Sequence, residues 1–186
     1  SYALNAEVVE NWLFVDAYAN ISQQFISPFG TQSSDPSLIN DNSTEVFTFG
    51  ITPYITGQVA GVVNYRASVN YSYTNSGTSA APGSETWGAD LSLDGTTRFP
   101  KLGWGITSTY REFDFSNSDE VTTDLFTVAS LNYAVTPYLR VSARANRETS
   151  NLVNQEERTS TGWGAGLYWS PSPRTNLSMT KDQRFY

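Results

Sequence analysis

The chain of 186 residues contains no cysteine and no histidine, and only 16% of its residues are charged. The lack of cysteine excludes a disulfide framework, a thiolate metal site and a cysteine nucleophile. The lack of histidine removes the commonest general base and the commonest zinc ligand, and it excludes Ser-His-Asp catalysis. The net charge of -7 lacks the basic character that nucleic-acid binding requires, so we expect no nucleic-acid partner.

Other catalytic and metal-binding patterns are also missing. The carboxylates are scattered, and no pair indicates the two-carboxylate chemistry of a glycosidase. The acidic stretch at 114–120 lacks the glycine and the full acidic set of an EF-hand loop, so we interpret it as a solvated loop. We therefore expect no catalytic residues, no metal site and no cofactor, and we predict that the protein is not an enzyme.

Long apolar runs are absent as well. No segment approaches the roughly 18 apolar residues of a transmembrane helix. Hydropathy alone would predict a soluble protein, but transmembrane strands alternate apolar and polar residues and average to mild polarity. Hydropathy therefore does not decide between the two classes.

What the sequence does contain is repeated two-residue alternation, which is typical of strands. The clearest case is 58–74, where Val63, Tyr65 and Ala67 alternate with Asn64 and Arg66. Thr, Ser, Asn, Tyr and Val dominate the composition, which also favours strands and turns. The pattern predicts about ten antiparallel strands, at about 1–10, 12–26, 45–56, 58–74, 85–94, 101–113, 122–135, 138–149, 158–169 and 174–185.

The lengths of the strands and of their connections indicate a transmembrane β-barrel. Globular strands average about 5–6 residues, whereas a tilted strand needs about 9–11 residues to cross a bilayer. Short turns are expected near 10–11, 56–57, 94–95, 136–137 and 171–173, and longer polar loops at 27–44, 74–84, 114–121 and 149–157. Short turns on one side and long loops on the other are typical of outer-membrane barrels.

Aromatic residues on the apolar faces of these strands fall near the strand ends. Such rings prefer the level of the lipid headgroups, so two belts are expected with Val, Ala, Leu and Ile between them. The alternative is that Tyr and Trp simply suit exposed strand faces in any β protein. The predicted membrane-interface aromatics are Trp104, Tyr133 and Trp169 near short turns, and Phe47, Tyr71, Tyr73, Trp87, Tyr110 and Trp163 near long loops.

The opposite faces carry charged residues in mid-strand, which would cost several kcal/mol each in lipid. We therefore expect them inside the barrel, and two interpretations stay open: a pore lining that attracts anionic solutes, or a salt-bridge network that fills a narrow barrel. In 162–169, GWGAGLYW, the alternate glycines are expected to face the interior and make room for side chains of neighbouring strands. The predicted pore-lining residues are Asp16, Arg66, Asp90, Arg111, Asp124, Arg140 and Arg144.

Two stretches also resemble a known family. They are 16–30, DAYANISQQFISPFG, and 169–178, WSPSPRTNLS, followed by RFY at 184–186. These motifs resemble the PEP-CTERM system-associated outer-membrane β-barrel family of Gram-negative bacteria with exosortase and exopolysaccharide loci. The sequence departs from the family at 181–183, KDQ, where small and basic residues are more usual. The resemblance implies an outer-membrane location and a link to surface polysaccharide or surface-protein display, and it brings no catalytic residues.

The prediction is an all-β chain that forms an antiparallel transmembrane β-barrel, with residues 1–186 as a single barrel domain or an interior portion of a larger one. The favoured function is a porin-like or export-associated channel. The alternatives are a non-conducting barrel that anchors surface polymer or partner proteins, and a soluble all-β carbohydrate-binding module. Expected partners are outer-membrane lipid, anionic solutes or polysaccharide, and surface or periplasmic proteins.

Overall fold

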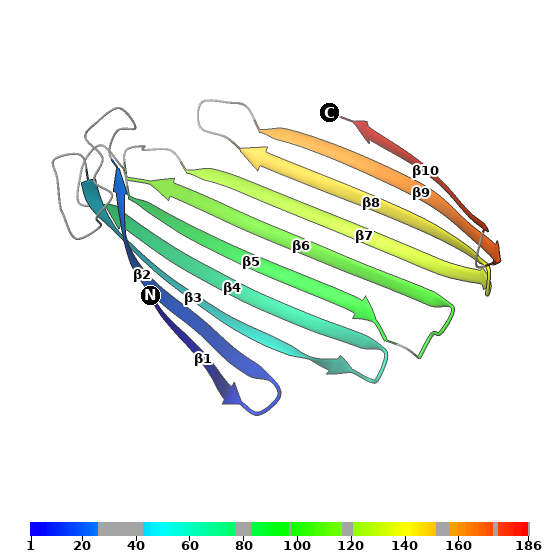
Figure 1. The fold of residues 1–186 in the computed structure, drawn as a ribbon, viewed down its shortest axis with the longest axis horizontal. Coiled ribbons are helices and arrows are strands. Elements are labelled where there is room, and N and C mark those ends of the chain that lie inside the picture. Colours follow the sequence, from blue (N-terminus) through cyan, green and yellow to red (C-terminus); the bar gives the residue numbers. More distant parts are fainter. Residues whose placement is uncertain are drawn as a thin grey trace.

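Ten strands form one antiparallel sheet in which every strand pairs with the next along the chain (Figure 1). The structure is a computed structural model that describes residues 1–25, 43–76, 83–96, 98–116, 121–151, 157–172 and 175–185. No helix in the described part of the chain is long and apolar enough to cross a membrane. The strands are β1 (Tyr2–Val9), β2 (Leu13–Phe25), β3 (Ser43–Val59), β4 (Val63–Ser76), β5 (Ser84–Gly95), β6 (Leu102–Phe115), β7 (Thr122–Thr136), β8 (Leu139–Asn151), β9 (Arg158–Ser172) and β10 (Thr175–Phe185).

The connections at the two ends of the sheet differ in length, as the sequence predicts, with one exception. At one end β1–β2, β3–β4, β7–β8 and β9–β10 are joined by two or three residues, but β5–β6 is joined by six, and at the other end β2–β3, β4–β5, β6–β7 and β8–β9 are joined by six residues or more. We call these the short-turn end and the long-loop end. The predicted loops 27–44, 74–84, 114–121 and 149–157 lie wholly or partly outside the described residues.

One predicted turn is wrong. The sequence places a turn near 56–57, but β3 continues to Val59 and the chain reverses over Ala60, Gly61 and Val62. Ala60 (φ 50°) and Gly61 (φ 68°) both adopt the left-handed conformation that a tight hairpin requires, and the Val62 amide donates to the Val59 carbonyl at 2.9 Å. Gly57 lies within β3, and the ring of Tyr65, its partner on β4, occupies the space that a side chain at this position would need.

Pro53 lies inside β3, which has a hydrogen-bonded neighbour on both sides. It pairs with Val15 of β2, whereas the β3–β4 register passes from Ile51↔Tyr71 to Tyr54↔Ser68 without a pair at 53. Proline has no amide hydrogen to donate to a ladder, which accounts for the local gap. The register is the same on both sides of the gap, so the two faces of the sheet continue unchanged.

The described sheet has no apolar core. Val46, 6% exposed, is its only buried hydrophobic residue, while Leu131 (47%), Trp87 (49%) and Trp169 (43%) on the apolar face are exposed. No second layer covers this face within the described residues. A soluble carbohydrate-binding module would require such a cover, because contiguous apolar patches of this extent are rare on soluble monomers.

The rows of paired residues run obliquely across the sheet. One row passes from Tyr65 through Leu93, Ile106, Ala129 and Ala145 to Trp163. Tyr65 lies near the short-turn end of β4, whereas Trp163 lies well inside β9. This progressive shift is the stagger that tilts strands relative to the axis of a barrel. Within the described residues the two edge strands, β1 and β10, do not pair, so the sheet is curved but open (Figure 1).

Candidate functional site

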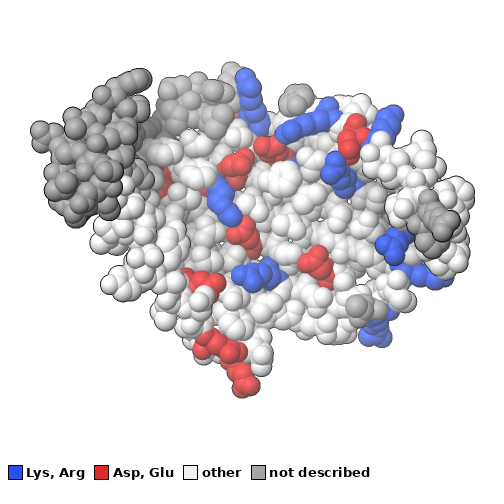
Figure 2. Space-filling view, in the orientation of Figure 1, with Lys and Arg blue, Asp and Glu red and all other residues white. Residues whose placement is uncertain are grey.

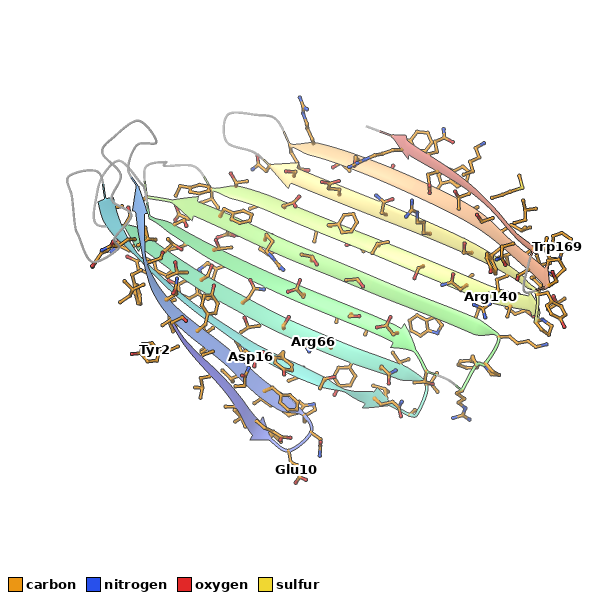
Figure 3. The ribbon with its side chains drawn as sticks, in the orientation of Figure 1. Tyr2, Glu10, Asp16, Arg66, Arg140 and Trp169 are labelled. Atoms are coloured by element: carbon orange, nitrogen blue, oxygen red, sulfur yellow. The ribbon has the colours of Figure 1, made fainter. Side chains whose placement is uncertain are left out.

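The seven residues predicted to line a pore all lie on one face of the sheet, which we call the polar face. Residues that oppose each other in a ladder share a face. Asp16 opposes Thr52 and Arg111 opposes Asp124, and the other members of the set lie in further rows of the same face. Figure 2 shows acidic and basic side chains interspersed over this face, and Figure 3 shows Asp16 and Arg66 over it. These residues are Asp16, Arg66, Asp90, Arg111, Asp124, Arg140 and Arg144.

The centre of the polar face is occupied by an ion pair. The Arg111 guanidinium donates to both carboxylate oxygens of Asp90, at 3.0 and 3.2 Å, and the two side chains are only about a third exposed (31% and 34%). Asn70 and Thr109 donate to the same carboxylate at 3.2 and 3.0 Å. Hydrogen-bond donors from both neighbouring strands, β4 and β6, therefore contact the Asp90 carboxylate. Gly88, between Asn70 and Arg111 in the row, leaves the space that both side chains occupy.

Two further ion pairs cross β9 and link β8 directly to β10. Arg144 donates to Asp182 at 2.7 Å above Gly164, where an added Cβ would lie 2.1 Å from the aspartate oxygen. Arg184 pairs with Glu148 and also donates to Ser160 of β9 at 3.1 Å. The expectation that the β9 glycines make room for neighbouring side chains is confirmed at Gly164.

Three other members of the predicted set have different surroundings. Arg66 lies over the ring of Tyr54, 3.9 Å from its centroid, in a cation–π contact. Asp16 accepts a hydrogen bond from the Asn5 amide at 2.8 Å. Asp124 has a buried oxygen, Oδ1, without a hydrogen-bond partner, although it opposes Arg111 in the ladder.

Arg140 lies near the short-turn end of the polar face, close to where β6 begins (Figure 3). It lines two hollows, of about 450 and 600 Å³, and it forms no ion pair with any described residue. Its surroundings therefore differ from those of Arg111 and Arg144.

The predicted aromatic residues all lie on the opposite, apolar face. Tyr71 opposes Trp87, with ring centroids 4.6 Å apart, and Trp104 opposes Leu131. Near the short-turn end the Trp12 indole nitrogen donates to the Tyr65 hydroxyl at 3.0 Å. The ladder registers place the whole set on this one face: Phe47, Tyr71, Tyr73, Trp87, Trp104, Tyr110, Tyr133, Trp163 and Trp169.

Several charged residues with clear structural roles were not in the predicted set. Glu148, Asp182 and Arg184 are partners in the ion pairs across β9. Glu148 lies in phase with the predicted Arg140 and Arg144 on β8, which was a usable signal, whereas no residue of β10 was in the predicted set. Lys181 is a different case, since it lies on the apolar face opposite Ala165 and reaches over the Trp163 ring, 6.0 Å from its centroid.

No cluster of metal-ligating side chains occurs among the described residues. The described part of the polar face carries positive and negative charges with hydroxyl and amide groups between them, which suits electrostatic contact with solutes.

Comparison with known proteins identifies the fold. No protein-family model and no characterised protein matches the sequence. The structure is similar to two structures of the outer-membrane protein OmpT of Vibrio cholerae, with TM-scores of 0.54 and 0.55 and 9% identity, covering 98% of this chain and 69% and 77% of theirs. The toluene transporter TodX of Pseudomonas putida matches at a TM-score of 0.41 and 11% identity, over 97% of this chain and 66% of TodX, which is too weak to support an inference.

The chain therefore has the fold of an outer-membrane β-barrel, represented by ten consecutive strands of an open sheet. At 9% identity the likeness to OmpT concerns the fold alone.

Proposed function

We propose that the protein is a porin-like or export-associated channel of the outer membrane of a Gram-negative bacterium. The observation that carries this proposal is the division of the sheet into two faces. Every predicted mid-strand charge lies on the polar face, and every predicted interface aromatic lies on the exposed apolar face. In a closed barrel the apolar face contacts lipid and the polar face lines a water-filled interior.

The electrostatics of the polar face support passage of charged solutes. Both signs are present along the face, so a solute meets alternating attraction and repulsion, and weak binding at several positions favours conduction. Arg66 and Arg140 form no ion pair with described residues, so each can attract anionic solutes locally. Asp16 and Asp124 on the same face are also in no ion pair with described residues, so the unpaired charge is of both signs.

The test is electrical. The full-length protein is extracted in detergent, its folded state is checked by heat-dependent mobility in SDS gels, and it is inserted into a planar bilayer under a KCl gradient. We expect discrete current steps and a reversal potential on the anion-selective side. Folded, heat-modifiable protein that inserts without any current would overturn the channel proposal.

A second candidate is a non-conducting barrel that anchors surface polymer or partner proteins. The observation that favours it is the set of ion pairs Arg111–Asp90, Arg144–Asp182 and Arg184–Glu148, because side chains that bridge strands occupy space inside a narrow barrel. Inserted protein without current, combined with retention of surface polymer by intact cells and its loss on deletion, would support this candidate.

The resemblance to the PEP-CTERM-associated barrels leads to a narrower proposal, that the barrel serves display of surface polysaccharide or protein. It rests on the two motifs at 16–30 and 169–178. Deletion of the gene should reduce the amount of surface polymer or exported protein without reducing its synthesis. Unchanged export in the deletion strain would contradict it.

A further inference from the structure

A hollow of about 450 Å³ lies at the short-turn end of the polar face, where the β5–β6 turn meets β7 and β8. Its lining includes Thr96, Lys101, Asn132 and Arg140. Its volume falls within the range of small-molecule sites. The walls and the charge of this hollow determine what it can bind.

The walls of the hollow are held by backbone hydrogen bonds. The Lys101 carbonyl accepts from the Ala134 amide at 2.7 Å, which extends the β6–β7 ladder through the turn. The Thr96 hydroxyl donates to the Gly61 carbonyl at 2.7 Å and its amide donates to the Val62 carbonyl at 3.0 Å, so the turn is also fixed to the β3–β4 hairpin. These bonds fix the backbone from which Lys101 reaches the hollow, and the β7–β8 and β8–β9 ladders fix that of Arg140.

The charged residues that line the hollow are all positive. Lys101 and Arg140 line it together with polar and apolar groups, and no carboxylate is part of the lining. Neither cation forms an ion pair with a described residue, whereas Arg111, Arg144 and Arg184 are all paired. Two cations facing one hollow without a counter-charge create a positive local potential that attracts anions.

The neighbouring hollow, of about 600 Å³, shares Arg140 and adds Tyr138, Tyr168 and Ser170. Arg140 is thus the common wall of two hollows. A guanidinium presents several donors in a planar fork that matches carboxylate and phosphate oxygens, and an ammonium adds a second point charge.

We propose that the hollow between Lys101 and Arg140 binds small anions that carry phosphate or carboxylate groups. The site itself is a property of the described residues. Its role in collecting anions at the entrance of a pore rests on the proposed function. Arg140 binds the anion through the planar donors of its guanidinium group, and Lys101 supplies a second positive charge.

The experiment measures binding of inorganic pyrophosphate to the full-length protein, folded in a zwitterionic detergent, by equilibrium dialysis at low salt, with citrate as the competing carboxylate probe. The variants are Arg140→Gln, Lys101→Gln and the matched control Arg144→Gln, which removes the same charge from an ion-paired arginine on the same face. Arg140→Lys keeps the positive charge and removes the planar set of guanidinium donors. Heat-dependent gel mobility confirms that each variant is folded.

We expect Arg140→Gln to weaken binding about tenfold, as for loss of one charge-assisted contact, with a smaller loss for Lys101→Gln. Arg140→Lys should be intermediate, Arg144→Gln should bind like the unaltered protein, and citrate should displace pyrophosphate. Equal weakening in all three Gln variants would mean a general charge effect, and absence of binding up to millimolar pyrophosphate would mean no site; either result overturns the proposal.

The two proposals fail separately. Specific pyrophosphate binding by a protein that inserts without current would overturn the channel and leave the anion site in place. Anion-selective current that is unchanged by Arg140→Gln and Lys101→Gln, with no difference in pyrophosphate binding, would overturn the anion site and leave the channel in place.

Discussion

The arginines at the centre of the polar face and the arginine at its short-turn end have opposite surroundings. Arg111 is held by both oxygens of Asp90, and Arg144 reaches across β9 to Asp182. Arg140 shares a hollow with a second cation, Lys101, and with no carboxylate. The comparison indicates that cations in the centre hold neighbouring strands together, whereas the cations near the turns are left available to solutes.

The largest effect should follow from breaking the central pair. Asp90→Ala removes the acceptor of Arg111, Asn70 and Thr109 and leaves a partly buried guanidinium unpaired. We expect a loss of about 2 kcal/mol in the free energy of unfolding. Arg140→Ala, the matched change at the end of the face, should cost less than about 0.5 kcal/mol. Denaturant titration of both variants in the same detergent compares them, and equal losses would remove the distinction between the two regions.

A smaller effect is expected from filling the space beneath an ion pair that crosses β9. In Gly164→Ala the new methyl group would meet the Asp182 carboxylate at 2.1 Å and the Arg144 Nε at 2.9 Å, so both side chains must move. We expect a loss of about 1 kcal/mol. Gly103→Ala is the control, since its nearest contact would be Asn132 Cβ at 3.8 Å. Unfolding midpoints that fall equally for both variants would show that the crossing ion pair is not the cause.

The smallest effect should come from Asp182→Asn. Its pair with Arg144 is more than half exposed (61% and 54%), and exposed pairs contribute at most about 1 kcal/mol and are weakened by salt. We expect a loss of about 0.5 kcal/mol at low salt that disappears near ~1 M salt. The loss in Asp90→Ala should persist at high salt. A salt-independent loss in Asp182→Asn would mean that this pair behaves like the central one.

Much of this fold could be predicted from the sequence, because two-residue alternation reports which side chains share a face. Every strand was expected, and Trp163, Ala165 and Leu167 were assigned to the face that the register shows. The turn near 56–57 was wrong because glycine has two uses in a sheet. Gly61 supplies a left-handed backbone, whereas Gly57 supplies space for the Tyr65 ring, and only the paired strand distinguishes them.

The partners within the site could not be predicted, because they depend on how far neighbouring strands are shifted. Alternation places Arg144 and Asp182 on one face, but only the combined registers of β8–β9 and β9–β10 bring them together above Gly164. The hollow at Lys101 and Arg140 likewise forms where a turn meets two strands that are distant in sequence. Periodicity therefore predicts faces, and register determines pairs and hollows.

The most direct test of the account is the accessibility of alternate positions along β8, which a cysteine-free chain permits without background. Ser142→Cys and Asn146→Cys lie on the polar face, and Ala143→Cys and Ala145→Cys lie on the apolar face. Each folded variant is reconstituted in lipid vesicles and treated with a small water-soluble maleimide. The account predicts labelling at 142 and 146 and protection at 143 and 145. Equal labelling at all four positions, or labelling at 143 and 145 alone, would contradict it.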